Sequence, residues 1–125
     1  MLYSRDRMPA VFVIAVDWRL RAALRAELRE RGVDALGMES GEDAGHAVAR
    51  GRMPAVVVLE AIAFLLDDPS LQKLIERVPA VVVASRTEAL ALPPSGPGLT
   101  LLYRPVRIGE IVDRVMTLLQ QGHTA

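Results

Sequence analysis

The chain has 125 residues, of which 51% are hydrophobic, and its 15 basic residues balance its 15 acidic residues to a formal net charge of zero. This length corresponds to one domain, and the apolar share is enough to form a core. Zero net charge disfavours a general nucleic-acid binder, because neutralising phosphates requires an excess of positive charge. The absence of cysteine excludes disulfides, zinc–thiolate centres, iron–sulfur clusters and cysteine nucleophiles.

The apolar runs are too short for a membrane span. The longest one near the start covers residues 9–16, whereas a helix needs about 20 apolar residues to cross a bilayer. Asp17 and an arginine-rich segment follow it, rather than the small residues of a signal-peptide cleavage site. We therefore expect a cytoplasmic protein without membrane partners. Residues 1–125 are expected to form a single domain with its core at about 10–121.

The first half of the chain alternates between strand and helix patterns. A continuous branched apolar run at 10–16 predicts a strand that is buried on both faces. Asp17 can cap a helix over 18–31, which Gly32 ends. A weaker strand is predicted at 33–38, followed by a helix from Ser40 or Gly41 to about Gly51.

The alternation continues in the second half of the chain. Strands are predicted at 54–60, 79–84 and 99–103, and helices from Pro69 onward and over 107–121. Between the last two strands, residues 86–92 suffice for two helical turns at most, because prolines and glycines occupy most of 93–98. The fourth helix is therefore expected to be stunted or missing.

Short buried strands joined by helices predict an α/β fold, specifically a flavodoxin-like doubly wound five-stranded parallel sheet of order 2-1-3-4-5. In such folds ligands and chemistry lie at the carboxyl ends of the strands. The residues predicted at those ends are Asp17, Trp18, Glu60, Ala84, Ser85 and Arg104.

Five segments at these positions carry a resemblance. They are residues 16–19, 41–44 (Gly-Glu-Asp-Ala), 54–60 (ending in Glu60), 84–85 and 103–106 (Tyr-Arg-Pro-Val). In order and spacing, the chain resembles the receiver domain of bacterial two-component response regulators over about residues 10–120. The similarity is to the family that includes the chemotaxis response regulators. It implies the fold predicted above and a role in two-component signal transduction.

The resemblance also implies which residues would perform phosphotransfer. A working receiver accepts a phosphoryl group from phosphohistidine on an aspartate, with magnesium held by an acidic pair and a lysine that neutralises charge. Here Asp17 retains one acid of the pair, and Trp18 replaces the other. Glu60 replaces the acceptor, Arg104 the lysine and Ala84 the hydroxyl residue. We therefore expect an atypical, or pseudo-, receiver with no catalytic residues and no cofactor, with magnesium at Asp17 as the alternative.

Glu60 and Arg104 are predicted to form an ion pair, because the guanidinium fork suits a carboxylate. The pair has two interpretations: a fixed imitation of the phosphorylated state, or a structural remnant of a decayed site. Trp18 is expected to fill part of the pocket, the alternative being packing over the first helix. Ser85 is expected to cap the short fourth helix, the alternative being that a bulge places its hydroxyl at the position of Ala84.

Several residues are candidates for contacts with other molecules. Leu101 stands where the resemblance implies a switching aromatic residue, and Met116 and Leu118 lie off the main apolar stripe of the last helix. Together with Tyr103 they are candidate interface residues. A homodimer contact is expected at Met116 and Leu118, the alternative being a fully buried last helix, which explains them equally well. Residues 64–66 (Phe-Leu-Leu) are expected to fold over the site or to contact a partner.

Arg21, Arg25 and Arg29 recur at every fourth position of the first helix. Such a row is usually a solvated face, and the alternative is a site for an acidic partner.

The sequence therefore predicts a signalling domain, not an enzyme, that binds a partner protein and no nucleic acid. Two alternatives stay open: a working phospho-accepting receiver in a phosphorelay, and a flavodoxin-like sensor of a small ligand.

Overall fold

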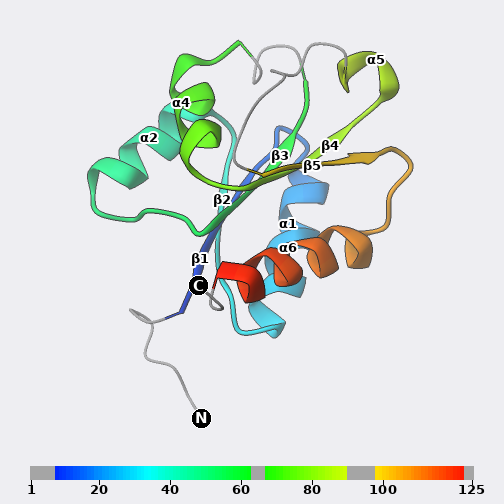
Figure 1. Ribbon diagram of the computed structural model, residues 1–125, viewed down its shortest axis with the longest axis horizontal. Coiled ribbons are helices and arrows are strands. Elements are labelled where there is room, and N and C mark those ends of the chain that lie inside the picture. Colours follow the sequence, from blue (N-terminus) through cyan, green and yellow to red (C-terminus); the bar gives the residue numbers. More distant parts are fainter. Residues whose placement is uncertain (1–7, 63–66, 90–97, 123–125) are drawn as a thin grey trace.

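A computed structural model describes residues 8–62, 67–89 and 98–122 as a parallel sheet between two layers of helices (Figure 1). The elements in chain order are β1 (Ala10–Ile14), α1 (Trp18–Glu30), β2 (Asp34–Met38), α2 (Gly41–Ala49), β3 (Val56–Glu60), α4 (Pro69–Arg77), β4 (Ala80–Ala84), α5 (Arg86–Ala89), β5 (Leu99–Tyr103) and α6 (Ile108–Gly122). The sheet order β2-β1-β3-β4-β5, parallel throughout, confirms the predicted topology.

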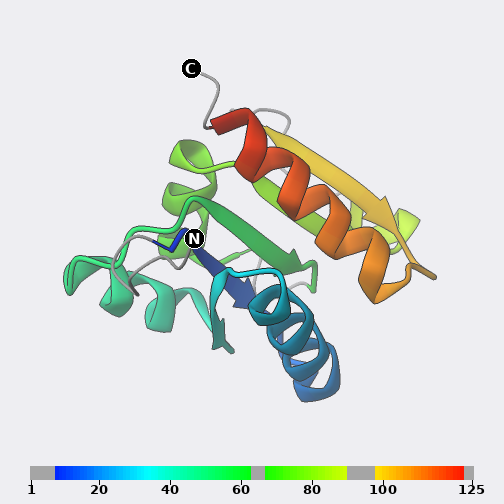
Figure 2. The same cartoon turned by 90° about the horizontal axis from the view of Figure 1, so that it is seen from below.

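The sheet is buried on both faces, which explains its continuous apolar strands. Every residue of β3 and β4 is buried. Helices α2 and α4 cover one face, where they pack on side chains such as Phe12, Leu59 and Val82. Helices α1 and α6 lie side by side over the other face (Figure 2). There they pack on side chains such as Val13 and Val58. Two core layers therefore hold the strands in register and fix where their ends lie.

Caps and glycines delimit α1 and α2 as the sequence predicted, and a cap also begins α4. The Asp17, Ser40 and Asp68 side chains each accept hydrogen bonds from backbone N–H groups in the first turn of the helix that follows. After α1 and α2 the chain turns at Gly32 and Gly51, whose φ angles of 82° and 88° suit residues without a Cβ.

The structure corrects one predicted boundary and confirms the short fourth helix. The first strand was predicted to reach Val16, but it ends at Ile14, and Val16 is 43% exposed in the loop before α1. The stunted fourth helix is confirmed, since the described helix after β4 has four residues, Arg86–Ala89. Residues 64–66, expected near the site, lie outside the described residues. No helix in the described segments is long and apolar enough to cross a membrane.

Candidate functional site

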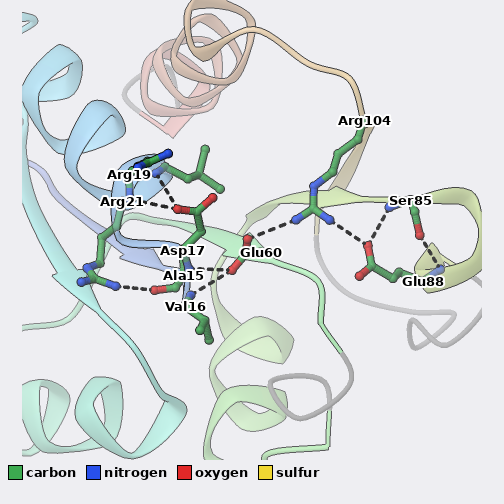
Figure 3. Close-up of polar contacts among 10 residues, drawn as sticks. Ala15, Val16, Asp17, Arg19, Arg21, Glu60, Ser85, Glu88 and Arg104 are labelled. Carbon is green, nitrogen blue, oxygen red and sulfur yellow. Dashed lines mark hydrogen bonds and ion pairs between the residues drawn. The ribbon is translucent and has the colours of Figure 1, made fainter.

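The carboxyl ends of β1, β3, β4 and β5 meet at one edge of the sheet, where Glu60 is the buried charged residue. Glu60 is 7% exposed and ends β3, between β1 and β4. Its Oε1 accepts hydrogen bonds from the backbone N–H groups of Val16 (2.9 Å) and Asp17 (3.2 Å) in the loop after β1 (Figure 3). These two donors compensate part of the cost of burying the carboxylate.

Arg104, in the loop after β5, supplies the countercharge. Its Nη2 donates to Glu60 Oε2 at 3.2 Å, which confirms the predicted ion pair. Its Nη1 donates to Glu88 Oε1 on α5 at 3.3 Å. The guanidinium therefore bridges two carboxylates (Figure 3). A lysine ammonium, a compact point charge, lacks the planar fork that this geometry uses.

Ser85 and Glu88 form a capping box around the short helix α5. The Ser85 hydroxyl accepts from the Glu88 N–H at 3.1 Å, and Glu88 Oε1 accepts from the Ser85 N–H at 2.8 Å. Ser85 therefore caps the helix as predicted. The buried Ala84 lies at the carboxyl end of β4 and carries no hydroxyl. Glu88 was not among the predicted site residues, although the Ser-x-x-Glu spacing from Ser85 is a recognisable signal for it.

Asp17 caps helix α1 and also contacts Glu60. Its Oδ1 accepts from the N–H groups of Arg19 (3.0 Å) and Leu20 (3.5 Å), so the carboxylate caps α1. Its backbone N–H binds Glu60, as described above. Asp17 therefore connects the start of α1 to the end of β3.

Trp18 does not fill the pocket, and our expectation that it would is wrong. Its side chain is 63% exposed, and the guanidinium carbon of Arg19 lies 5.5 Å from the centre of its ring. Trp18 is the first residue of α1, directly after the Asp17 cap, and it is not among the residues that line the cavity at this edge of the sheet. Glu60 and Arg104 instead meet at this edge of the sheet, and open space remains beside their ion pair.

The donor set does not fit magnesium. This ion needs several oxygen ligands in an octahedron, usually from carboxylates and water. Both oxygens of Glu60 already accept hydrogen bonds, Asp17 caps α1, and Trp18 offers no oxygen. Within residues 8–62, 67–89 and 98–122, no three His, Asp or Glu side chains are grouped as a metal site requires.

A cavity of about 630 Å³ lies over the ion pair. It combines apolar walls with a charged floor. The residues that line it are Asp17, Leu20, Glu60, Ile62, Val83, Arg104, Pro105 and Val106. The edge of the sheet therefore has space beside the ion pair for part of another molecule.

The candidate interface residues divide into two groups. Leu101, Met116 and Leu118 are partly buried and pack against the protein's own core layers. Tyr103 is 46% exposed, with the guanidinium carbon of Arg86 5.2 Å from the centre of its ring. Only Tyr103 among these four therefore presents a large exposed apolar surface.

Comparisons with protein-family models and with curated proteins gave no match. Solved structures do match, at low identity. The Francisella response regulator 1452 receiver domain has a TM-score of 0.68 and 19% identity, covering 91% of this chain and 98% of that one. A response regulator receiver protein from Burkholderia phymatum has a TM-score of 0.70 and 20% identity, covering 90% and 95%.

A third match comes from a streptococcal family described as redox sensors that evolved from two-component response regulators. It has a TM-score of 0.73 and 15% identity, covering 93% of this chain and 53% of that one. Identities of this size establish architecture alone. Together with the strand order and the site at the strand ends, these matches show that the chain has the fold of a response-regulator receiver domain.

Proposed function

We propose that this protein is an atypical receiver domain of bacterial signal transduction that binds a partner protein and does not accept a phosphoryl group. The observation that carries the proposal is the state of Glu60, whose two carboxylate oxygens both accept hydrogen bonds from the protein. An acceptor carboxylate attacks phosphorus through an oxygen lone pair, and it needs cationic help at the phosphoryl oxygens. At this site the cation, Arg104, already binds the carboxylate itself.

Of the two interpretations of the ion pair, we favour a fixed imitation of the phosphorylated state. Glutamate extends one methylene beyond aspartate, so its charge lies toward the place of a phosphoryl group. Its oxygens connect the loop after β1 to the loop after β5, and Arg104 extends the connection to Glu88 on α5. A decayed site would not require these segments to be joined through Glu60 and Arg104.

The first experiment is incubation with a small-molecule phosphodonor and magnesium, followed by intact-mass measurement. We expect no added phosphoryl mass on this protein, while a receiver domain with an aspartate acceptor gains it under the same conditions. A phosphoryl adduct that disappears in the Glu60→Ala variant would show a working receiver and overturn the proposal.

The second experiment tests protein binding. The wild-type protein and its Arg104→Ala variant are used as baits in the source cells, with Arg107→Ala as the matched control. Arg107 is a neighbouring exposed arginine whose side chain makes no hydrogen bond or ion pair within the described residues. We expect a partner that the wild type and Arg107→Ala retain and Arg104→Ala loses. Equal capture by all three baits would show that the network around Arg104 does not set the binding state.

A further inference from the structure

A row of arginines on α1 lies against the free edge of the sheet. Arg21, Arg25 and Arg29 are spaced by four residues, so they share the helix face next to β2. Among the described residues, β2 is an outer strand that pairs with β1 alone. The aliphatic stems lie so close to Gly37 of β2 that a Cβ there would come within 2.7 Å of Arg25 Cδ and 3.0 Å of Arg21 Cγ. Glycine at position 37 therefore makes room for this arginine row.

The two outer arginines of the row are anchored by the protein. Arg21 Nη1 donates to the carbonyl of Ala15 at 2.7 Å (Figure 3), and its Nη2 donates to Glu39 at 3.4 Å. Arg29 Nη2 donates to the carbonyl of Ala35 at 3.3 Å. These contacts cover backbone carbonyls near the sheet edge and fix the ends of the row. The row is therefore not the freely solvated face that such spacing usually indicates.

The central arginine has no acceptor. Arg25 is half-buried, and its Nε is sealed from solvent without a hydrogen-bond partner. Within the described residues, its terminal nitrogens have no hydrogen bond or ion pair either. Like charges four residues apart on a helix destabilise it, and in the part of the chain that the structure describes Glu39 is the one carboxylate that pairs with the row. A carboxylate placed on Arg25 would relieve the repulsion and satisfy its free donors.

We infer that the row Arg21–Arg25–Arg29 is the docking site for an acidic segment of a partner protein, with Arg25 as the residue that receives a carboxylate. The inference rests on the proposed protein-binding function and names the partner's chemistry. A nucleic-acid partner is disfavoured because the chain has zero net charge, and a carboxylate already sits on the row at Arg21. The guanidinium fork matches carboxylates, and the free edge of β2 lies beside it.

The test is a titration of the ¹⁵N-labelled full chain with an oligoglutamate peptide. Binding is monitored by NMR through the backbone N–H and arginine Nε–H signals. We expect shifts concentrated at Arg25, Ala35 and Gly37, and weaker binding as salt increases. The Kd of the Arg25→Gln variant for the peptide should be about five times the Kd of the Arg50→Gln variant. Arg50→Gln is the control, because it removes an equal charge from the exposed end of α2. Gly37→Ala should also weaken binding, at constant charge, because its Cβ displaces the Arg25 stem.

Three results would overturn the inference. The first is equal Kd values for Arg25→Gln and Arg50→Gln, which would indicate non-specific attraction. The second is tighter binding of an oligodeoxythymidylate probe to the same residues, which would indicate nucleic acid. The third is that the peptide causes chemical-shift changes only in residues away from α1 and β2. The intact-mass experiment on Glu60 is unaffected by any of them, so the two proposals fail separately.

Discussion

Replacing Arg104 with alanine removes the charged donor that faces the buried carboxylate of Glu60. Breaking a fully buried ion pair from one side costs about 3–5 kcal/mol, whereas an exposed pair contributes about 0–1 kcal/mol. The Glu60 side chain is 8% exposed but the Arg104 side chain is 39% exposed, so this pair lies between the two cases. Glu60 also keeps its N–H donors from Val16 and Asp17.

We therefore expect Arg104→Ala to lower the free energy of unfolding by about 2 kcal/mol, which corresponds to a Tm decrease of about 6–10 °C. Arg104→Lys should cost about half as much, because an ammonium keeps the charge but not the fork that also reaches Glu88. Arg107→Ala, which removes an exposed arginine nearby, should stay within about 0.5 kcal/mol of the wild type.

The assay is urea unfolding followed by circular dichroism, arranged as a double-mutant cycle of Arg104→Ala with Glu60→Gln. If the pair interacts as the structure shows, the coupling free energy should be about 1–2 kcal/mol. A coupling below about 0.5 kcal/mol would refute the argument that Arg104 stabilises the buried carboxylate. Equal m-values in all variants would establish that the cycle compares the same two states.

Three further predictions use the same unfolding measurement. Ser85→Ala removes the cap of α5 and should cost about 0.5–1 kcal/mol, together with faster amide exchange at Glu88; unchanged exchange would contradict the capping box. Trp18→Ala should change stability by less than about 0.5 kcal/mol, because the side chain is 63% exposed; a large loss would place the ring in the core. Gly32→Ala should lower the free energy of unfolding by about 1 kcal/mol, because Gly32 has a positive φ. Gly45→Ala should raise it by about 0.5–1 kcal/mol, because Gly45 lies within α2 and an added Cβ would meet only Ser70, at 3.9 Å. Equal effects of the two substitutions would contradict these backbone assignments.

The fold was predictable because its signals are local and repeated. Continuous branched runs such as 80–84 identify strands buried on both faces, and Asp17 and Gly32 mark where α1 begins and ends. Parallel strands then require crossover helices, which restricts the topology to few choices. The boundary of β1 was less predictable, because Val16 is apolar in sequence yet lies exposed in a loop.

The site was predictable only in part. The ion pair of Glu60 and Arg104 follows from strand-end positions and charge. The N–H groups that bind Glu60 Oε1 have no side-chain signature, since any residue at positions 16 and 17 would supply them. The orientation of Trp18 was mispredicted because its position next to the strand end does not show whether its side chain faces the site or the solvent. The packing of the Arg25 stem depends on Gly37, which is distant from it in sequence.

The guanidinium of Arg104, shared by two carboxylates, has a consequence for how this sequence can change over generations. Shortening Glu60 to aspartate withdraws the carboxylate from its partners, and replacing Arg104 with lysine gives up the bridge to Glu88. Either step alone breaks a contact of this network and therefore loses stability. Single substitutions at either position therefore carry a stability cost of their own, separate from any effect on signalling.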